Sequence, residues 1–314
     1  MHIWRSLGEV PADLGRTAVT IGNFDGVHRG HRAVVSRARA LADEAGVPLV
    51  AVTFDPHPMA VLRPEHAPST LSTIPERAEL LAEAGVDHVL ALPFDRAMAA
   101  WTPDEFVQWV LVDALGAAVV AVGSNFRYGS RAAGDLAHLT AAGETHDFTA
   151  VGVPLDGGPQ VWSSTYVRTC LAAGDVAGAA EALGRPFSVR GVVERGDQRG
   201  RELGYPTANV PVRPAAASPA DGVYAGWLTC LSGADAGSRH PAAISVGTNP
   251  TFDGERERRV ESYVLDRTDL ELYGVEVEVA FVERVRGMAR FDSVGQLLEA
   301  MAGDVARTRE ILLG

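Results

Sequence analysis

The sequence predicts an α/β fold: an N-terminal Rossmann-like domain with a parallel sheet, then a small antiparallel β-barrel that ends in a helix. From Ala18 to about Leu183, short apolar runs alternate with longer segments of 3.6-residue periodicity. After Arg185-Pro186, β-branched runs are separated by glycine and proline, which is typical of a barrel. The length of 314 residues allows two domains. We place them at 1–183 and 184–314.

The N-terminal strands are expected where the apolar runs are short and continuous. These runs are 18–21, 48–54, 88–92 and 117–123. A helix is expected after the first run, because apolar residues from Ala33 to Ala45 recur with helical spacing. Another is expected at 102–115, which opens with a threonine cap, proline at the first helical position and acidic residues.

The C-terminal domain reads as a series of strands with turn residues between them. We expect strands in 187–196, 222–231, 240–247, 258–265 and 274–285, and a final helix from 294 to 313. Glycine and proline turn signals lie between these strands, and the one helix-like stretch comes only at the end. This pattern favours antiparallel pairing.

The amino-acid composition argues against several classes of protein. The chain is 46% hydrophobic and 22% charged, close to the average of ordered globular proteins. Its formal charge of -12, without a long basic run, argues against nucleic-acid binding, which depends on neutralising phosphates. All 28 basic residues are arginine, so a Walker A loop, which needs lysine, is excluded.

Location can also be inferred from the sequence. The two cysteines, Cys170 and Cys230, indicate neither a disulfide framework nor a metal cluster. We therefore expect a reducing, cytoplasmic setting. The N-terminus lacks an apolar targeting segment, and the run 110–123 is too short to span a bilayer, so we expect no membrane partner. The sequence leaves the oligomeric state open.

The first candidate site is the segment 22–31, "GNFDGVHRGH", which follows the strand at 18–21. Open α/β sheets bind ligands at the carboxyl ends of their strands. A helix that begins near Arg29 would direct its N-terminal amides at an anion, with His28 and His31 beside it. Imidazoles there could stabilise charge that develops on an α-phosphate. Alone, a pair of exposed loop histidines would be the commoner explanation.

This segment resembles the H-x-G-H signature of the α/β nucleotidylyltransferases, in the form found in bacterial FMN adenylyltransferases. The resemblance implies that His28 and His31 are catalytic, with ATP and FMN as substrates. It also implies ATP contacts from the glycine-rich loop and from "SSTYVR", which would cap a helix and return an arginine to the phosphates. The implied ATP-binding residues are Gly22, Asn23, Phe24, Gly30, Ser163, Ser164 and Arg168.

Two further motifs follow in the order of that family, "VTFDPHP" at 52–58 and "GSNFRYGSRAAGD" at 123–135. Each follows an expected strand. The family commonly has Asp where Asn125 stands, so a role for charge at that position is in question. The resemblance places the flavin next to Asp55, His57, Asn125, Phe126, Arg127 and Tyr128.

The second candidate site is the segment 196–210, "GDQRGRELGYPTANV". Gly196, Gly200 and Gly204 could form a phosphate-binding loop. Along a strand, Thr207 and Asn209 would point the same way, and their oxygens suit Mg²⁺. In isolation, a long surface hairpin would be the plainer interpretation.

The string "LGYPTANV" is similar to the P-T-A-N motif of riboflavin kinases, whose fold is a small β-barrel. The resemblance implies that Gly196, Gly200, Gly204, Thr207 and Asn209 bind ATP and Mg²⁺, with Thr207 and Asn209 as metal ligands. It also implies riboflavin as the substrate.

Glu261 in "VESYVLD" is the candidate general base for this transfer. Strand alternation groups it with Tyr263 and Leu265 on a mostly apolar face, but periodicity alone does not show which way that face points. The kinase family carries a catalytic glutamate in this context. A flavin or nucleotide contact is also implied for Arg286, for which a surface position is nearly as reasonable.

Together these motifs cover almost the entire chain, in the order of the bacterial bifunctional riboflavin kinase/FAD synthetases. The implied function is phosphorylation of riboflavin to FMN, followed by adenylylation of FMN to FAD with release of pyrophosphate. Both steps would use ATP and Mg²⁺. The alternatives are a nucleotidylyltransferase for another substrate, and a flavin-binding regulator that has lost catalysis. The P-T-A-N string argues against the first, and the presence of the candidate catalytic side chains argues against the second.

Overall fold

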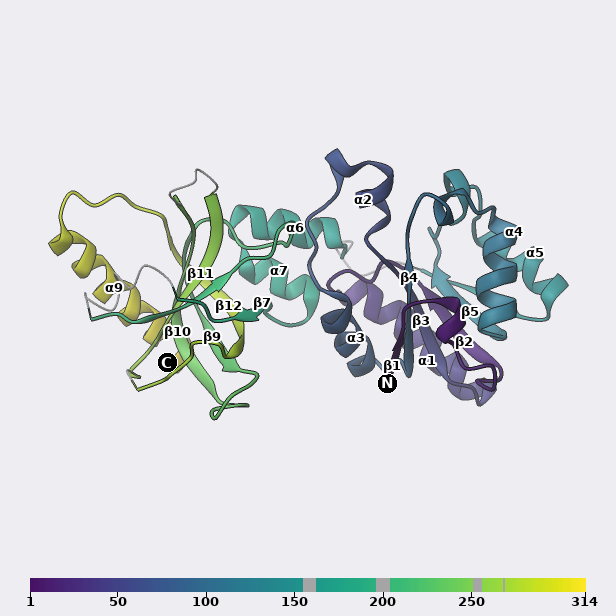
Figure 1. Cartoon of the computed structure of the whole chain (residues 1–314), viewed down its shortest axis with the longest axis horizontal. Helices are drawn as coiled ribbons and strands as arrows, with labels where there is room; N and C mark the ends of the chain where they lie inside the picture. The colour runs from purple at the N-terminus through teal and green to yellow at the C-terminus, as the bar shows by residue number, and fades with distance from the viewer. Residues whose placement is uncertain (155–161, 196–203, 251–255, 268) are drawn as a thin grey trace. The chain divides into compact units, whose positions relative to one another are not determined.

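The computed structural model describes residues 1–154, 162–195, 204–250, 256–267 and 269–314. The chain divides into two compact units, Met1–Ser164 and Thr165–Gly314. The units correspond to the two predicted fold types, a parallel α/β sheet and an antiparallel barrel (Figure 1).

The first unit is built on a six-stranded parallel sheet in the order β1-β4-β3-β2-β5-β6. Its strands are β1 (His2–Trp4), β2 (Thr17–Ile21), β3 (Leu49–Asp55), β4 (His88–Pro93), β5 (Ala117–Gly123) and β6 (Thr149–Val153). The four predicted strands are confirmed. β1 and β6, which the sequence analysis did not predict, form the two edges of the sheet.

Helices cover both faces of this sheet. One face packs on α1 (Arg29–Ala45) and α3 (Ile74–Glu83), and the other on the segment 103–115 and on α5 (Leu136–His146) (Figure 1). Alternate strand residues serve the two layers, so Ala18 faces α1 while Val19 faces the opposite layer. Both layers contain buried aliphatic side chains. A three-layer α/β/α unit results.

The predicted helix at 102–115 is only partly α-helical. Thr102 caps it as expected, with a capping box to Glu105, and α4 (Pro103–Phe106) follows. Val107–Ala114 then forms a π-helix, labelled η4. The wider turn accompanies a fully apolar inner face that includes Val110 and Leu111.

The second unit is a six-stranded antiparallel sheet in the order β7-β12-β9-β10-β11-β8. Its strands are β7 (Phe187–Val192), β8 (Thr207–Pro211), β9 (Gly222–Cys230), β10 (Arg239–Pro250), β11 (Arg256–Val264) and β12 (Glu276–Gly287). The end strands approach each other, because the amide of Glu194 donates to the carbonyl of Asn209 at 2.9 Å. The sheet therefore curls into the predicted barrel.

Helices α6 (Ser164–Ala173), α7 (Val176–Leu183) and α9 (Val294–Leu313) belong to the described part of this unit. α6 and α7 precede the barrel, and α7 packs on β7 and β12. The final helix α9, predicted from sequence, lies against β9, β10 and β12 (Figure 1). Ser293 caps α9, since its hydroxyl accepts from the amide of Gln296.

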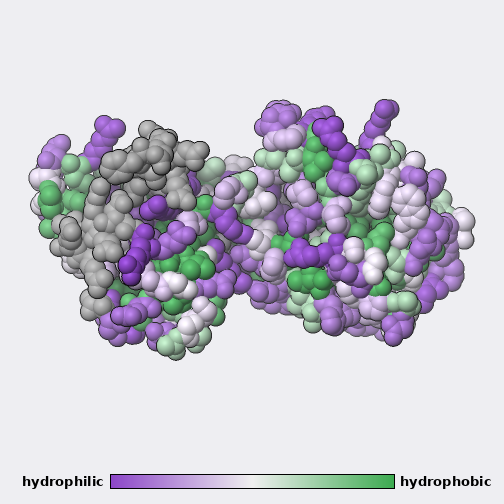
Figure 2. Space-filling model, viewed as in Figure 1, coloured by the Kyte–Doolittle hydropathy of each residue, from purple (hydrophilic) through white to green (hydrophobic). Residues whose placement is uncertain are grey.

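Surface hydrophobicity is distributed rather than concentrated. On the face shown in Figure 2, hydrophobic side chains lie among hydrophilic ones. No helix among the described residues is long and apolar enough to cross a membrane.

Candidate active sites

The first candidate site lies at the point where the strand order of the parallel sheet reverses. The chain leaves β2 toward β3 and β4 on one side, and returns to place β5 on the other. The loops after β2 and β5 therefore open at the same edge of the sheet, on either side of this point. Open α/β sheets bind their ligands there.

The loop after β2 holds a strained conformation. Phe24 has φ 48° and Val27 has φ 43°, although neither is glycine. Backbone in this region costs on the order of 1 kcal/mol or more for each residue, and it persists where neighbours enforce it. Both side chains are buried, Phe24 at 2% exposure and Val27 at 0%. The packing of this unit thus supports a fixed loop shape.

The buried carboxylate of Asp25 holds this loop in place. Asp25, 1% exposed, accepts from the amides of Leu71 and Ser72, both at 3.0 Å, and from the hydroxyl of Ser72. It also pairs with Arg77 of α3 at 3.4 Å. The sequence analysis did not single out Asp25 or Arg77. Asp25 lies within the quoted motif, but a charge there gives no sign of a partner 52 positions away.

The two histidines of the loop lie together as predicted. His28 precedes α1 and its Nδ1 accepts from the amide of His31 at 3.3 Å. The two rings stack with centroids 3.6 Å apart. A Cβ on Gly30 would lie 3.0 Å from the carbonyl oxygen of Trp162 and 3.1 Å from the His28 ring. Glycine at this position therefore lets the chain approach both groups.

The His31 imidazole is held in its neutral form. Burial, together with the nearby charges of His28 and Arg77, lowers the pKa of His31 well below its usual range. Its Nδ1 is buried and has no hydrogen-bond partner in the described part of the chain. A neutral ring with its proton on Nε2 can donate one hydrogen bond to a ligand oxygen.

The predicted flavin residues also gather at this edge of the sheet. Asp55 ends β3, next to β2, and His57 caps the short helix α2 (Pro58–Leu62) by accepting from the amide of Met59 at 3.1 Å. Asn125 is exposed in the loop after β5. Their strands are neighbours of β2, so all three residues border the loop that carries the histidines.

The ring of Phe126, in the loop after β5, packs against a second aromatic ring. Its ring stacks on Tyr128 with centroids 5.4 Å apart. Tyr128 itself is buried, and its hydroxyl lies 2.7 Å from Nδ1 of His138. Arg127 is exposed and lies 3.6 Å from Asp135. Phe126 thus offers the accessible ring, and Tyr128 supports it.

The segment "SSTYVR" continues from this site into the next unit. Ser164 lies beside the histidine loop, because its hydroxyl donates to the carbonyl of Asp25 at 2.9 Å. Arg29 lies over the ring of Trp162, 5.9 Å from its centroid. Ser163 directly precedes α6, and Arg168 lies within this helix, in the second unit.

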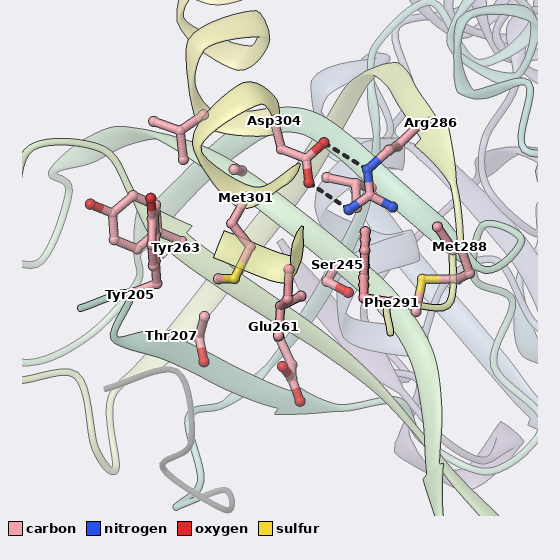
Figure 3. Close-up of a pocket in the computed structure, with 15 residues that line it drawn as sticks. Tyr205, Thr207, Ser245, Glu261, Tyr263, Arg286, Met288, Phe291, Met301 and Asp304 are labelled. Carbon is pink, nitrogen blue, oxygen red and sulfur yellow. Dashed lines mark hydrogen bonds and ion pairs between the residues drawn. The ribbon is translucent and has the colours of Figure 1, made fainter. Parts of the chain in front are cut away.

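The second candidate site is a cavity of about 270 Å³ between α9 and one face of the barrel sheet (Figure 3). Glu261 and Tyr263 of β11 line it, which settles the orientation that strand alternation left open. Leu265, the third residue of that group, lies beyond the end of β11. Aromatic and sulfur-containing side chains also line it: Tyr205, Phe291, Met288 and Met301.

Arg286 closes one side of this cavity through an ion pair. Its Nε and Nη2 each donate to the carboxylate of Asp304 at 2.7 Å, which ties β12 to α9 (Figure 3). Its guanidinium also lies over the ring of Phe291, 5.7 Å from the centroid. Arg286 is therefore a wall of the cavity, with much of its hydrogen-bonding capacity already used by Asp304.

A second cavity, of about 500 Å³, lies on the other side of β8. Thr207 borders both cavities, and Asn209 borders the larger one. Gly204 also lines this cavity, whereas Gly196 and Gly200 lie outside the described residues. Arg195, Arg267 and Glu271 lie in its wall, and the guanidinium of Arg267 is paired with the carboxylate of Asp269. A polar cavity thus adjoins an apolar one along a single strand.

Glu261 stands where these features meet. Strand pairing places it opposite Asn209 of β8 on one side and Ser245 of β10 on the other. Figure 3 shows its carboxylate and the hydroxyl of Thr207 at the same end of the smaller cavity, away from the Arg286–Asp304 pair. A third cavity, of about 470 Å³, also includes Glu261. The predicted threonine, asparagine and glutamate are therefore close neighbours.

Comparison with known proteins identifies both halves. A family model described as FAD synthetase matches residues 10–165, and one described as riboflavin kinase matches residues 183–312. A bifunctional riboflavin kinase/FMN adenylyltransferase of Escherichia coli strain K12 is 38% identical over 294 residues, 93% of this chain and 91% of that protein. The chain belongs to this family. It is a transferase, with an N-terminal FAD synthetase domain and a C-terminal riboflavin kinase domain.

Other members support this assignment over the full length. The bifunctional riboflavin kinase/FMN adenylyltransferase of Pseudomonas fluorescens is 38% identical, covering 99% of this chain and 98% of that protein. A solved structure of a macrolide-efflux protein from Streptococcus pneumoniae has a TM-score of 0.86 and 31% identity to this chain, with 98% of each chain covered.

The predicted fold class is confirmed by these observations. The boundary between the two compact units falls between residues 164 and 165. The FAD synthetase model ends at residue 165 and the riboflavin kinase model begins at residue 183, so most of α6 and α7 lies between the two matched regions. The predicted domain boundary between residues 183 and 184 assigns α6 and α7 to the N-terminal domain, and it stays a prediction.

Proposed function

We propose that the barrel transfers the γ-phosphoryl group of ATP to a ribityl hydroxyl of riboflavin, and that the sheet unit transfers AMP from a second ATP to the resulting FMN. The observation that carries this proposal is the position of Thr207 and Glu261 at one end of the smaller cavity, with Thr207 also bordering the larger one. We assign the first reaction to residues 184–314 and the second to residues 1–183.

Riboflavin fits the cavity beneath α9. Its volume of about 270 Å³ is near the lower end for small-molecule sites, and its lining is largely apolar. The rings of Tyr205 and Tyr263 form a T-shaped pair with centroids 5.1 Å apart, which offers a flat edge to a planar ring system. With the isoalloxazine ring there, the ribityl chain would extend toward Glu261.

ATP fits the larger cavity, where Arg195 favours phosphate. Mg²⁺ fits Thr207 and Asn209, because hydroxyl and amide oxygens are hard ligands. The amide nitrogen of Asn209 donates to the carbonyl of Thr207 at 3.3 Å, so its oxygen remains an acceptor. When bound, Mg²⁺ would neutralise charge on the transferred phosphate.

The side-chain oxygens of Thr207 and Asn209 suit a metal ion that binds together with the nucleotide. Two uncharged oxygens bind a divalent ion weakly on their own, and Mg²⁺ commonly completes its shell with substrate phosphates and water. In the parts of the chain that the structure describes, no group of three histidine, cysteine, aspartate or glutamate side chains could hold a metal ion.

Glu261 acts as the general base for riboflavin phosphorylation. Its carboxylate lies at the same end of the smaller cavity as Thr207, which also borders the larger cavity, so the acceptor hydroxyl and the γ-phosphate would meet near these two side chains. Accepting the hydroxyl proton as the oxygen attacks requires no covalent enzyme intermediate. Positioning of the two substrates would supply most of the rate enhancement.

His28 and His31 act on the triphosphate in FMN adenylylation. The neutral His31 ring donates to a phosphate oxygen at which charge develops, and the helix N-terminus provides further donors. The phosphate of FMN attacks the α-phosphorus, and pyrophosphate leaves. Phe126 and the loop of Asp55 and His57 would hold the flavin at the same sheet edge.

The test separates the two reactions on one chain. His28→Ala should abolish FAD formation from FMN and leave FMN formation from riboflavin unchanged, and Glu261→Gln should do the reverse. Chromatography of riboflavin, FMN and FAD in a time course with ATP and Mg²⁺ measures both. Glu276→Ala, at an exposed position on β12, is the matched control for Glu261. Equal loss of both reactions in either variant, with the fold intact by circular dichroism, would contradict the assignment.

We also propose a cytoplasmic location without a nucleic-acid partner. Cys170 and Cys230 are both buried and unpaired, as expected for a reducing compartment. The net charge of -12 would repel a phosphate backbone. Small-molecule substrates account for the sites described above.

A further inference from the structure

We propose that Arg77 is a positioning residue for FMN adenylylation, which acts on His31 through the buried carboxylate of Asp25 and through its own charge. This inference rests on the proposed catalytic role of His31. Arg77 lies on α3, outside the histidine loop and outside every motif discussed above.

Arg77 is the centre of a buried polar cluster. It is 5% exposed, and its guanidinium donates to the hydroxyl of Thr53 at 2.9 Å and to the carbonyl of Ser72 at 3.3 Å. It also donates to Oδ1 of Asp25 at 3.4 Å. An arginine and an aspartate this deeply buried are rare without a specific reason, because desolvating both charges is costly.

Each partner of Arg77 in turn holds the backbone of the histidine loop. The hydroxyl of Thr53 donates to the carbonyl of Asn23 at 3.0 Å, and the hydroxyl of Ser72 accepts from the amide of Gly26 at 3.0 Å. Asp25 is itself a loop residue. The cluster thus holds Asn23, Asp25 and Gly26, three positions of the strained segment that precedes Val27 and His28, and so sets where the imidazoles lie.

Arg77 also sets the charge near His31. The His31 ring is flanked by Phe24, edge to face with centroids 5.3 Å apart, and by His28. Among the described residues, the charges that act on its pKa are those of His28 on its own segment and Arg77 on α3, and the carboxylate of Asp25 is paired with Arg77. Arg77 disfavours protonation of His31, and Asp25 would favour it. With both present, the ring stays neutral and can serve as a hydrogen-bond donor at neutral pH.

Arg77→Met removes the positive charge and leaves the Asp25 carboxylate in place. Both effects make His31 easier to protonate, so the pKa of His31 should rise. The acid limb of kcat/KM for FMN adenylylation should move to higher pH by the same amount. NMR titration of the His31 ring, assigned with His31→Asn, gives a readout that does not depend on activity. Arg37→Met, at an exposed position on α1, is the matched control.

Two additional variants keep the test decisive if Arg77→Met folds poorly. Arg77→Lys retains the charge, and should keep the wild-type acid limb while lowering kcat. Asp25→Asn combined with Arg77→Met removes both charges, and should shift the acid limb less than Arg77→Met alone. Riboflavin phosphorylation by the same chain should be unchanged in each variant.

The possible outcomes separate the inference from the function on which it rests. Full FAD formation by His31→Asn would overturn the catalytic role of His31. Loss of FAD formation in His31→Asn, with an unmoved acid limb and His31 titration in Arg77→Met, would overturn the role of Arg77 alone. A uniform fall in rate at every pH would mean that Arg77 only supports the fold, and would also overturn the proposal.

Discussion

Replacing Asp304 with alanine removes the carboxylate that ties α9 to β12 beside the proposed riboflavin cavity. The Asp304 side chain is 10% exposed and that of Arg286 is 28% exposed. Truncating one partner of a fully buried pair costs about 3–5 kcal/mol, and partial exposure of Arg286 reduces this to about 2 kcal/mol. Because residues of α9 form one wall of the cavity, we expect the loss to appear in flavin binding.

The expected effect on binding follows from that free energy. About 2 kcal/mol corresponds to a roughly 30-fold rise in the Kd for riboflavin, if α9 must be in place for the cavity to form. Quenching of riboflavin fluorescence on titration with the protein measures the Kd directly. The KM for riboflavin in FMN formation should rise in parallel, whereas adenylylation of supplied FMN should be unchanged.

The matched control is Arg307→Ala. Arg307 also joins α9 to β12, by donating to Glu283 at 3.2 Å, but both side chains are about half exposed. An exposed ion pair of this kind contributes less than about 1 kcal/mol, so the Kd should change by less than about fivefold. A riboflavin Kd within threefold of wild type in Asp304→Ala would refute the reasoning that α9 is held over the cavity by this pair.

Two other predictions concern the barrel. Thr207→Val should lower riboflavin phosphorylation and raise the Mg²⁺ concentration needed for half-maximal rate, because one of two proposed ligands is lost; an unchanged Mg²⁺ dependence would exclude Thr207 as a ligand. Gly226→Ala should destabilise the barrel by about 2 kcal/mol, since the added methyl would overlap the carbonyl of Ala280. Urea unfolding measures this change. Gly303→Ala on α9, where nothing lies within 4 Å of the added methyl, is the control and should not be destabilised.

Much of the fold could be predicted from sequence because long apolar runs are buried on both faces of a parallel sheet. The run at 117–123 coincides with β5, for example. β1 and β6 escaped prediction because edge strands are short and only partly buried, which leaves a weak pattern. The π-helical part of 102–115 also has no sequence signal, since its apolar residues fit either helical period.

The site was predictable where function is carried by consecutive residues. The segment 22–31 and the P-T-A-N string each place their side chains within one loop or one strand, so the sequence alone brings them together. The orientation of Glu261 needed the structure, because strand alternation does not say which face is covered. The pairing of Asp25 with Arg77 needed it too, since the partners come from separate elements.

The closure of the barrel bears on how the kinase site is held together. β8 pairs along its length with β11, and in the part of the chain that the structure describes its other edge meets the chain after β7 through the bridge between Glu194 and Asn209. The strand that carries Thr207 and Asn209 is therefore also the strand at which the two ends of the barrel sheet meet. An ion bound by those two side chains would lie at this junction. Binding of the nucleotide with its ion would therefore also stabilise the closed barrel.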